Sequence, residues 1–337
     1  MGSEKTYKAA VIGCGKIAGG YDRSPGGEWT VTHAGAYRLC PRTELAAAAD
    51  VSGGALAAFG KRWGVESLYA DYREMLERER PEIVSLCLPA GEHFEAFRAA
   101  CAAGARAVFL EKPIAREAEA ARRMPALAEG RPVAVNYFRR WNPTLAGLRE
   151  EIGRGAHGRP LRVTVHYVKG LAENASHFID LLRWFFGEPG EIRLLRAFEG
   201  PEGDPAADFE LVFGEGLIAT FLHVPAPGYV LHEVDIFTER GRLIVAQRGE
   251  KLLRLPAAEE PHGRGFRILR LEGGAAETEW RNCPLRAVEE LVGCIEGGGA
   301  PACALEDGIR ALEICGEILP GNSPRPRAPG MSEEKGT

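Results

Sequence analysis

The chain has 337 residues and a net charge of −5, with 45% hydrophobic and 26% charged residues. This length and composition fit an ordinary globular protein of about two domains. They argue against nucleic acid and anionic membranes as main partners, because both attract basic surfaces, and no apolar run is long enough to span a bilayer.

The first part of the chain alternates strand-like and helix-like segments. Apolar runs predict strands at 8–12, 44–50, 83–88, 107–110 and 133–136. Helical patterns lie between them, such as 72–80 and 94–103, and Gly104 is the expected end of the latter. This alternation is typical of βαβ units, so we predict an α/β fold with a Rossmann-type, doubly wound parallel sheet over residues 1–142.

The pattern changes after Asn142-Pro143. Segments 161–167, 209–213, 217–223 and 230–237 alternate with period two and predict a large, mostly antiparallel, open sheet. Helices are predicted at 176–186, 285–296 and 305–319, and we expect an apolar stripe on the last one to pack back onto the first domain. The stripe consists of Leu305, Ile309, Leu312 and Leu319. We assign 143–320 to a second α/β domain and expect a disordered tail at 321–337, which is rich in Pro, Gly and charge.

The first strand runs into a glycine-rich turn that fits the pattern G-x-G-x-x-A. The glycines allow a tight turn and a close approach of the backbone to a pyrophosphate, which then lies at the amino end of the next helix. The turn therefore predicts a dinucleotide site. Its expected contacts are Gly13, Gly15, Lys16, Ile17 and Ala18.

Asp50, at the end of the second predicted strand, is the candidate partner for the ribose hydroxyls of the cofactor. A carboxylate there would repel a 2′-phosphate, so NAD is favoured over NADP. Gly15 and Asp50 lie 35 residues apart, where about 20 is usual. The excess fits an insertion at 19–29, which is too glycine-rich for a helix. A helix cap is the alternative interpretation of Asp50.

The segment Glu111-Lys112-Pro113 follows the short apolar strand at 107–110. Open α/β sheets bind ligands outside the carboxyl ends of their strands, so Glu111 and Lys112 are expected beside the cofactor. An ammonium group there can stabilise a developing alkoxide, and it can relay a proton if its pKa is depressed. The alternative is a surface salt bridge. The Lys112–Pro113 bond is a candidate for the cis form.

Five segments together resemble the Gfo/Idh/MocA oxidoreductase family, which includes glucose-fructose oxidoreductase and inositol 2-dehydrogenase. They are residues 13–18, 88–93, 111–113, 136–143 and 176–180, and the E-K-P motif with a downstream H-x-x-D helix is the specific part. The resemblance implies a substrate pocket between a Rossmann domain and the open sheet. It also implies oxidation or reduction of a carbinol on a sugar, cyclitol or nucleotide sugar, and assembly as a homodimer or homotetramer through that sheet.

By position in the motifs, Lys112 matches the family's active-site lysine and His177 its histidine. A neutral imidazole can take a hydroxyl proton while a hydride leaves for nicotinamide, although a structural histidine is the alternative. Asp180, one turn later, is expected either to orient this imidazole or to bond to backbone. Many members have Asp four residues before the histidine and Gly two before it. This chain has Glu173 and Ala175 instead, so its geometry and substrate can differ.

The remaining candidates are secondary. Pro89 and His93 match a P-x-x-x-H loop that passes near nicotinamide in the family, with a helix cap as the alternative for His93. Arg139 and Arg140 can hold a carboxylate or a diphosphate, or form a solvated basic pair. The other expected substrate contacts are Asn136, Asn174, Tyr21 and Trp29, the last two on a hypothetical lid formed by the insertion.

Two other functions stay open at this point. The replaced Asp at position 173 suggests a sugar sensor that keeps the fold and the cofactor but has lost catalysis. A redox-cycling enzyme that retains its NAD through a whole cycle is the second. The presence of both Lys112 and His177 favours a dehydrogenase over the sensor.

The cysteines point to a reducing environment. Eight are scattered through the chain without a C-x-x-C pair, and several lie in apolar runs, as Cys87 does. We interpret them as small buried hydrophobes and expect no metal site. Residues 1–6 also lack the apolar core of a signal peptide, so we expect a cytoplasmic protein.

Overall fold

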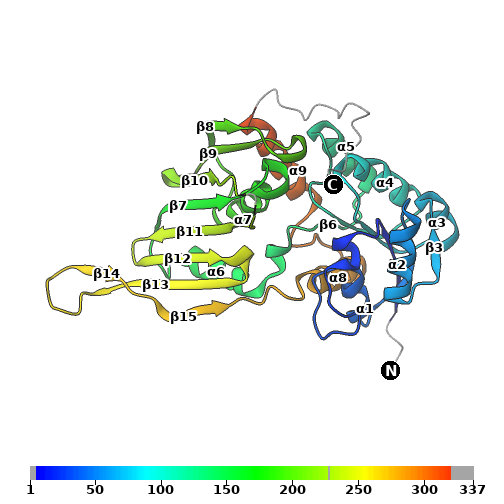
Figure 1. Cartoon of the computed structure of the whole chain (residues 1–337), viewed down its shortest axis with the longest axis horizontal. Coiled ribbons are helices and arrows are strands. Elements are labelled where there is room, and N and C mark those ends of the chain that lie inside the picture. Colours follow the sequence, from blue (N-terminus) through cyan, green and yellow to red (C-terminus); the bar gives the residue numbers. More distant parts are fainter. Residues whose placement is uncertain (1–4, 227, 320–337) are drawn as a thin grey trace, which may run out of the picture.

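The computed structural model describes residues 5–226 and 228–319, and the predicted tail at 321–337 lies outside these residues. Two sheets dominate the fold (Figure 1). A parallel sheet flanked by helices lies on one side, and a larger sheet lies on the other, with the hairpin of β13 (Lys251–Glu259) and β14 (Arg267–Leu269) extending outward from its edge. The predicted fold class is confirmed.

The first sheet has the strand order β3-β2-β1-β4-β5-β6, and all its pairs are parallel. This is the order of a dinucleotide-binding Rossmann fold. Its strands are β1 (Tyr7–Ile12), β2 (Thr43–Ala49), β3 (Ser67–Tyr69), β4 (Ile83–Leu86), β5 (Ala107–Leu110) and β6 (Val133–Val135). Its helices are α1 (His33–Leu39), α2 (Gly53–Trp63), α3 (Tyr72–Glu79), α4 (Ala90–Ala102) and α5 (Ala118–Ala128). The five predicted strands are all present, with ends within two residues.

The first crossover departs from a regular βαβ unit. After β1 the chain forms a single π-helical turn, η1 (Lys16–Gly20), and helix α1 begins only at His33. The loop between them is held by Asp22, which is 4% exposed. Its carboxylate accepts hydrogen bonds from the Thr30 hydroxyl at 2.6 Å, the Val31 N–H at 2.9 Å and the Thr32 hydroxyl at 2.7 Å. These hydrogen bonds hold Asp22 against residues 30–32, and the exposed residues 23–26 of the insertion lie between them in the chain.

The second sheet has the order β14-β13-β12-β11-β7-β10-β9-β8, and β15 also pairs with β13. All its pairs are antiparallel except β7 with β10. Its strands are β7 (Pro160–Tyr167), β8 (Glu191–Phe198), β9 (Ala206–Phe213), β10 (Leu217–His223), β11 (His232–Thr238), β12 (Gly241–Ala246), β13 (Lys251–Glu259), β14 (Arg267–Leu269) and β15 (Glu272–Glu277). Helices α6 (Pro143–Gly153) and α7 (Ser176–Phe186) pack on one face. Helix α7 has the bounds that the sequence predicts.

Two hydrophobic cores meet near Asn142. Trp141 belongs to the core of the parallel sheet, as does helix α8 (Cys283–Gly297), whereas Leu145 belongs to the core of the second sheet. Helix α9 (Leu305–Ile318) joins both, with Leu305 and Leu312 in the first core and its last turn in the second. Leu319, which the sequence predicts on the same stripe as Leu305, packs in the second core, because the helix passes from one core to the other.

Other sequence features have simple structural outcomes. All eight cysteines are free, and six are buried. In the described part of the chain no helix is long and apolar enough to cross a membrane. The same residues contain no group of His, Cys, Asp and Glu side chains that could hold a metal ion.

Candidate active site

The two sheets and their helices border a cleft of about 1470 Å³ at the carboxyl ends of the parallel strands. Most of the predicted site residues line it: Ile17, Tyr21, Trp29, Pro89, Glu111, Lys112, Asn136, Arg139, Glu173, Asn174 and His177. Other predicted residues do not: Gly13, Gly15, Lys16, Ala18, Asp50, His93, Arg140 and Asp180. The first five of these residues form or brace the glycine turn. For the last three, His93, Arg140 and Asp180, the predicted role in the site is wrong.

The glycine turn is shaped for a close approach of a ligand to the backbone. Gly13 has a φ of +90°, and a Cβ atom there would lie 2.5 Å from the carbonyl oxygen of Cys87. At Gly15 an added Cβ would meet no atom within 4 Å, so there is open space in front of the turn. This arrangement fits a pyrophosphate, which needs both a tight turn and an uncovered backbone.

Asp50 braces this turn. One carboxylate oxygen accepts a hydrogen bond from the Cys14 N–H at 2.6 Å, and the other accepts one from the Ser52 N–H at 2.7 Å. The cap of α2 is Ser52, whose hydroxyl accepts from the Ala55 N–H. The helix-cap interpretation of Asp50 is therefore wrong, and its carboxylate lies beside the backbone of the turn.

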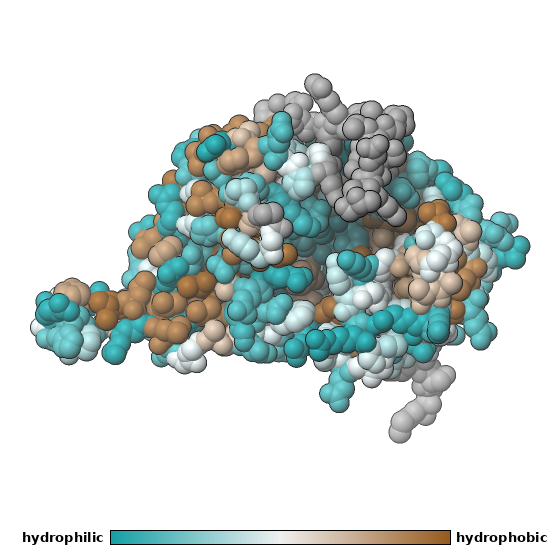
Figure 2. Space-filling view, viewed as in Figure 1, coloured by the Kyte–Doolittle hydropathy of each residue, from teal (hydrophilic) through white to brown (hydrophobic). Residues whose placement is uncertain are grey.

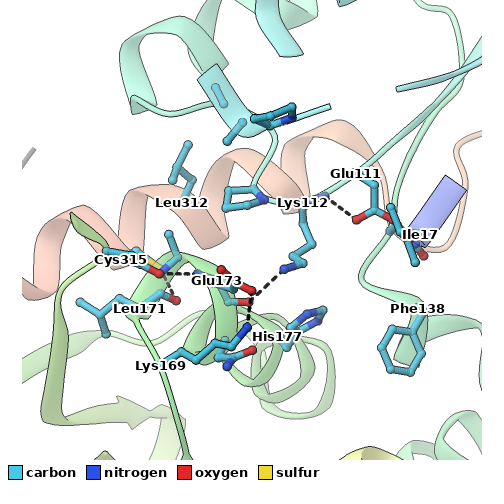
Figure 3. Close-up of a pocket in the computed structure, with 18 of the residues that line it drawn as sticks. Ile17, Glu111, Lys112, Phe138, Lys169, Leu171, Glu173, His177, Leu312 and Cys315 are labelled. Carbon is cyan, nitrogen blue, oxygen red and sulfur yellow. Dashed lines mark hydrogen bonds and ion pairs between the residues drawn. The ribbon is translucent and has the colours of Figure 1, made fainter. Parts of the chain in front are cut away.

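Lys112 follows β5 and extends toward Glu173 in the turn before α7 (Figure 3). Its ammonium donates a hydrogen bond to the carbonyl oxygen of Glu173 at 3.0 Å. The Lys112–Pro113 peptide bond is cis, as predicted. Burial lowers the pKa of this lysine below its usual value, while the carboxylates of Glu111 and Glu173 oppose that shift.

Glu111 connects Lys112 to a buried hydrogen-bond chain. Its carboxylate is 7% exposed and accepts from His33 Nε2 at 3.0 Å and Asn136 Nδ2 at 2.5 Å. The Nδ1 atom of His33 lies 2.8 Å from the Ser85 hydroxyl. Burial by itself raises the pKa of Glu111, but the hydrogen bond and charge of His33 bring it below its usual value. Glu111 thus fixes the backbone of Lys112 and holds Asn136, whose Oδ1 is buried without a partner.

His177 lies in the first turn of α7, and its ring faces the cleft beside Lys112 (Figure 3). The edges of Tyr137 and Phe138 surround it, with ring centroids 5.5 Å and 5.9 Å away. Burial lowers the pKa of His177 well below 6.5, and the nearby cations Lys112 and Arg139 lower it further. The imidazole is therefore neutral near pH 7 and free to accept a proton.

The residue that replaces the family's aspartate contacts Lys112 through its backbone. The Glu173 carbonyl accepts from Lys112, whereas its carboxylate pairs with Lys169 Nζ at 2.8 Å. Its N–H donates to Asp204 at 2.8 Å. The neighbouring Asn174 is buried and donates to the Val168 carbonyl at 2.9 Å. Both residues line the cleft, but these hydrogen bonds also hold the turn before α7 in place.

Asp180 does not orient His177, and Arg140 is not available to a substrate. Asp180 is 1% exposed, and its two oxygens accept from Arg140 Nε at 3.0 Å and Nη2 at 2.7 Å. Arg140 also donates to Asp307 at 2.8 Å and to the Ala302 carbonyl at 3.1 Å. This buried cluster ties α7 to α9 and to the segment after β6. The H-x-x-D spacing places both side chains on one helix, but the aspartate points away from the cleft.

His93 also has a different place from the one expected. Helix α4 begins at Ala90, so His93 lies inside the helix and is fully buried. Its Nδ1 donates to the Pro113 carbonyl at 2.8 Å, which fixes the loop that carries Lys112. Both the cofactor contact and the helix cap are therefore wrong for this residue. His93 thus supports the loop of Lys112 and Pro113 from inside helix α4.

Five basic residues that line the cleft were not predicted as site residues, namely Arg23, Arg116, Lys169, His232 and Arg248. The His232 ring lies 6.4 Å from that of His177, at an inward position of β11, whose other inward residues are Val234, Ile236 and Thr238. A histidine at an inward position of a strand is the sequence signal that identifies His232 as a candidate site residue. Lys169 and Arg248 both lie in turns with positive φ, where no periodic pattern marks their direction.

Comparison with known proteins adds to this geometry. Residues 7–138 match the GFO_IDH_MocA family, described as "Oxidoreductase family, NAD-binding Rossmann fold". The chain is 25% identical to D-apiose dehydrogenase from Paraburkholderia graminis over 92% of this chain and 86% of that protein. It is 35% identical to an inositol 2-dehydrogenase from Acidothermus cellulolyticus over 32% of this chain and 35% of that protein. Levoglucosan dehydrogenase, solved with NADH and levoglucosan, shares the fold with a TM-score of 0.76 and 19% identity, over 94% of this chain and 96% of that chain.

Proposed function

We propose that this chain, which belongs to the Gfo/Idh/MocA oxidoreductase family, is an NAD(H)-dependent dehydrogenase or reductase acting on a carbinol or carbonyl carbon of a sugar-like substrate. The family resemblance predicted from the five sequence segments is confirmed. The observation that carries the proposed reaction is the meeting of Lys112 and His177, from different domains, in one cleft beside the glycine turn.

The mechanism uses these two groups on one carbon–oxygen bond. Bound NAD would supply the hydride-transfer chemistry. The glycine turn would hold its pyrophosphate, and Asp50 its ribose hydroxyls. The Lys112 ammonium lies where it can stabilise negative charge on the reacting oxygen, and the neutral His177 can take the proton from that oxygen during oxidation. Asn136, with a free buried oxygen beside Glu111, would help to orient the ring of the cofactor or the substrate.

The carboxylate of Asp50 supports NAD over NADP. It lies beside the glycine turn and carries lone pairs suited to two ribose hydroxyls. A 2′-phosphate in the same place would bring negative charge against this carboxylate.

A screen with NAD and NADH tests the proposed function. Purified protein should bind NADH and change its absorbance with at least one sugar, cyclitol, sugar acid or nucleotide sugar. Cofactor binding without hydride transfer, even in a single turnover with the whole panel, would favour a sensor. Tightly bound NADH in the protein as purified, with turnover but no release of cofactor, would favour the redox-cycling reaction.

The pH profile of oxidation should reflect the shifted pKa values. Because His177 has a lowered pKa, it becomes protonated, and inactive as a base, only in acid, so the acidic limb of kcat/KM should lie below pH 6.5. Lys112 loses its proton at a pH below its usual value, so the alkaline limb should lie below 10.5. Lys112→Arg keeps a cation at all these pH values and should remove the alkaline limb. An acidic limb at or above 6.5 would contradict the role of His177.

We further propose two domains, at 1–142 and 143–320, and assembly as a homodimer or homotetramer through the open sheet. The change of core between Trp141 and Leu145 supports a boundary at 142, although helix α8 and the start of α9 pack back into the first core. Exposed Leu194 and Leu195 on β8 support the second, and Figure 2 shows apolar side chains among polar ones over the outer strands. Sedimentation of the full chain, which gives its mass in solution, tests the assembly.

The cytoplasm is the compartment we propose, from the eight free cysteines. Thiols persist in a reducing environment, whereas extracellular proteins tend to pair them.

A further inference from the structure

The substrate end of the cleft contains a buried guanidinium without a carboxylate partner. Arg139 is 2% exposed and lines the cleft. Its Nη2 donates to the Arg248 carbonyl at 2.7 Å, while Nε and Nη1 have no hydrogen-bond partner. Among the described residues it forms no ion pair, whereas its neighbour Arg140 pairs with both Asp180 and Asp307.

The position of Arg139 is fixed by its surroundings. Its guanidinium lies over the ring of Phe138 at 4.7 Å and over that of Phe178 at 4.9 Å. A Cβ atom at Gly249 would lie 3.3 Å from its Nε, so the turn after β12 packs closely against it. A buried charge held in this way and left unpaired is costly, because water is excluded and no anion compensates it.

The largest charge acting on Arg139 is a cation, Arg248, while the carboxylate of Asp180, which acts in the opposite sense, is paired with Arg140. The side chain of Arg248 is exposed at the cleft wall, and His232 lies nearby with its Nε2 buried and unpartnered. Burial is the main cause that lowers the pKa of His232 to about 3. The charged groups that lower this pKa further are all cations, and Arg139 and Arg248 have the largest effects among them. Arg139 itself has its pKa lowered to about 9, first by burial and then by Arg248. The carboxylate of Glu173 is already paired with Lys169.

We propose that Arg139, with Arg248 and His232, binds an anionic group of the substrate, a carboxylate or a phosphate ester on a polyhydroxylated chain. The proposal rests on the proposed function and narrows its substrate class from sugars in general to sugar acids or sugar phosphates. An anionic oxygen placed here supplies the charge that the protein does not, and arginine binds such groups through strong charge-assisted hydrogen bonds. Arg139 lies near His177 in the cleft. The carbinol that reacts would therefore be close to the anionic group along the substrate chain.

The test compares matched substrates on the enzyme loaded with NAD. D-Glucose, D-glucuronate, D-gluconate and D-glucose 6-phosphate share hydroxyl patterns but differ in charge, and their binding is measured by calorimetry beside turnover. We expect the wild type to bind at least one anion about tenfold or more tightly than glucose. Arg139→Met should lower affinity for that anion by about 10- to 100-fold and affinity for glucose by less than about threefold. Preference for carboxylates or for the phosphate identifies which anion the site takes.

Arg149→Met is the matched control. Arg149 also stacks on an aromatic ring, that of Trp184 at 5.3 Å, and donates to one backbone carbonyl, but it does not line the cleft. This variant should change neither affinity. Should Arg139→Met fail to fold, Arg248→Gln replaces it, because that side chain is exposed.

The outcomes separate the two proposals. Equal or tighter binding of glucose, or an equal loss for charged and neutral ligands in both Arg139→Met and Arg248→Gln, would overturn the anion site even if the enzyme is active. Anion binding that depends on Arg139 in a protein without hydride transfer would support the site and contradict the proposed reaction.

Discussion

Replacing Lys112 by alanine should lower kcat for hydride transfer by about 10²- to 10⁴-fold, while the affinity for NADH changes by less than about threefold. The ammonium lies in the cleft and donates to the backbone of the turn that precedes His177. Its stabilisation of charge on the reacting oxygen is needed mainly in the transition state, so ground-state cofactor binding should change little. Stopped-flow absorbance of NADH and fluorescence titration measure the two quantities.

Lys169→Ala is the control for this prediction. Lys169 also lines the cleft and also bonds to Glu173, but through the carboxylate rather than the carbonyl. Its removal takes away a positive charge of the same kind without removing the group beside His177, so kcat should fall by less than about tenfold. Full turnover in Lys112→Ala would contradict the assigned chemistry.

Asp180→Asn should lower the free energy of unfolding by about 3–5 kcal/mol, because it leaves Arg140 buried with its main counter-charge removed. Asp180 is 1% exposed and holds Arg140 through two hydrogen bonds, at the contact between α7, α9 and the segment after β6. Since neither residue lines the cleft, kcat per folded molecule should stay within about tenfold of the wild type. Urea unfolding and active-site titration measure these two effects.

Glu95→Gln is the matched control for stability. Glu95 also accepts two hydrogen bonds from one arginine, Arg98, but both side chains are about half exposed. Surface pairs of this kind contribute about 1 kcal/mol or less, so the loss should be small. If Asp180→Asn left stability intact but moved the acidic limb of the pH profile, Asp180 would act on His177 after all.

The strongest sequence signals were local ones. The bounds of α7, the strand β5 and the end of α4 before Gly104 agree with prediction, because apolar periodicity and glycine act within a few residues of the chain. The start of α4 was wrong by four residues, since Pro89 rather than a polar side chain precedes it. That error placed His93 at a helix cap. His93 lies inside the helix instead, and its Nδ1 donates a hydrogen bond to the Pro113 carbonyl.

Charged side chains were harder to assign than elements. Arg139 and Arg140 are adjacent in sequence and were predicted as a pair, yet one lines the cleft without a counter-charge and the other is paired with Asp180 and Asp307. Neighbouring residues on a short 3₁₀ turn point in different directions, so adjacency gives no information about the partner. The partner of Arg140 lies 40 residues away, and only packing of α7 against that turn brings it there.

The sequence by itself determined that a parallel sheet is followed by a mostly antiparallel one, but not the strands β3, β8 and β12 to β15. It also determined the glycine turn for NAD, the cis lysine–proline bond and the helix that carries His177. Each depends on residue types within a short window, where backbone preference and the burial of one face fix the outcome. Only the tertiary structure decided which groups share the cleft. It brings Arg139 and His232 beside His177, and it places the Glu173 carbonyl where it accepts a hydrogen bond from Lys112. It also places Asp180 in a structural ion pair with Arg140, outside the cleft. Electrostatic partners are set by distance in space, and that distance depends on how the two cores pack across α9.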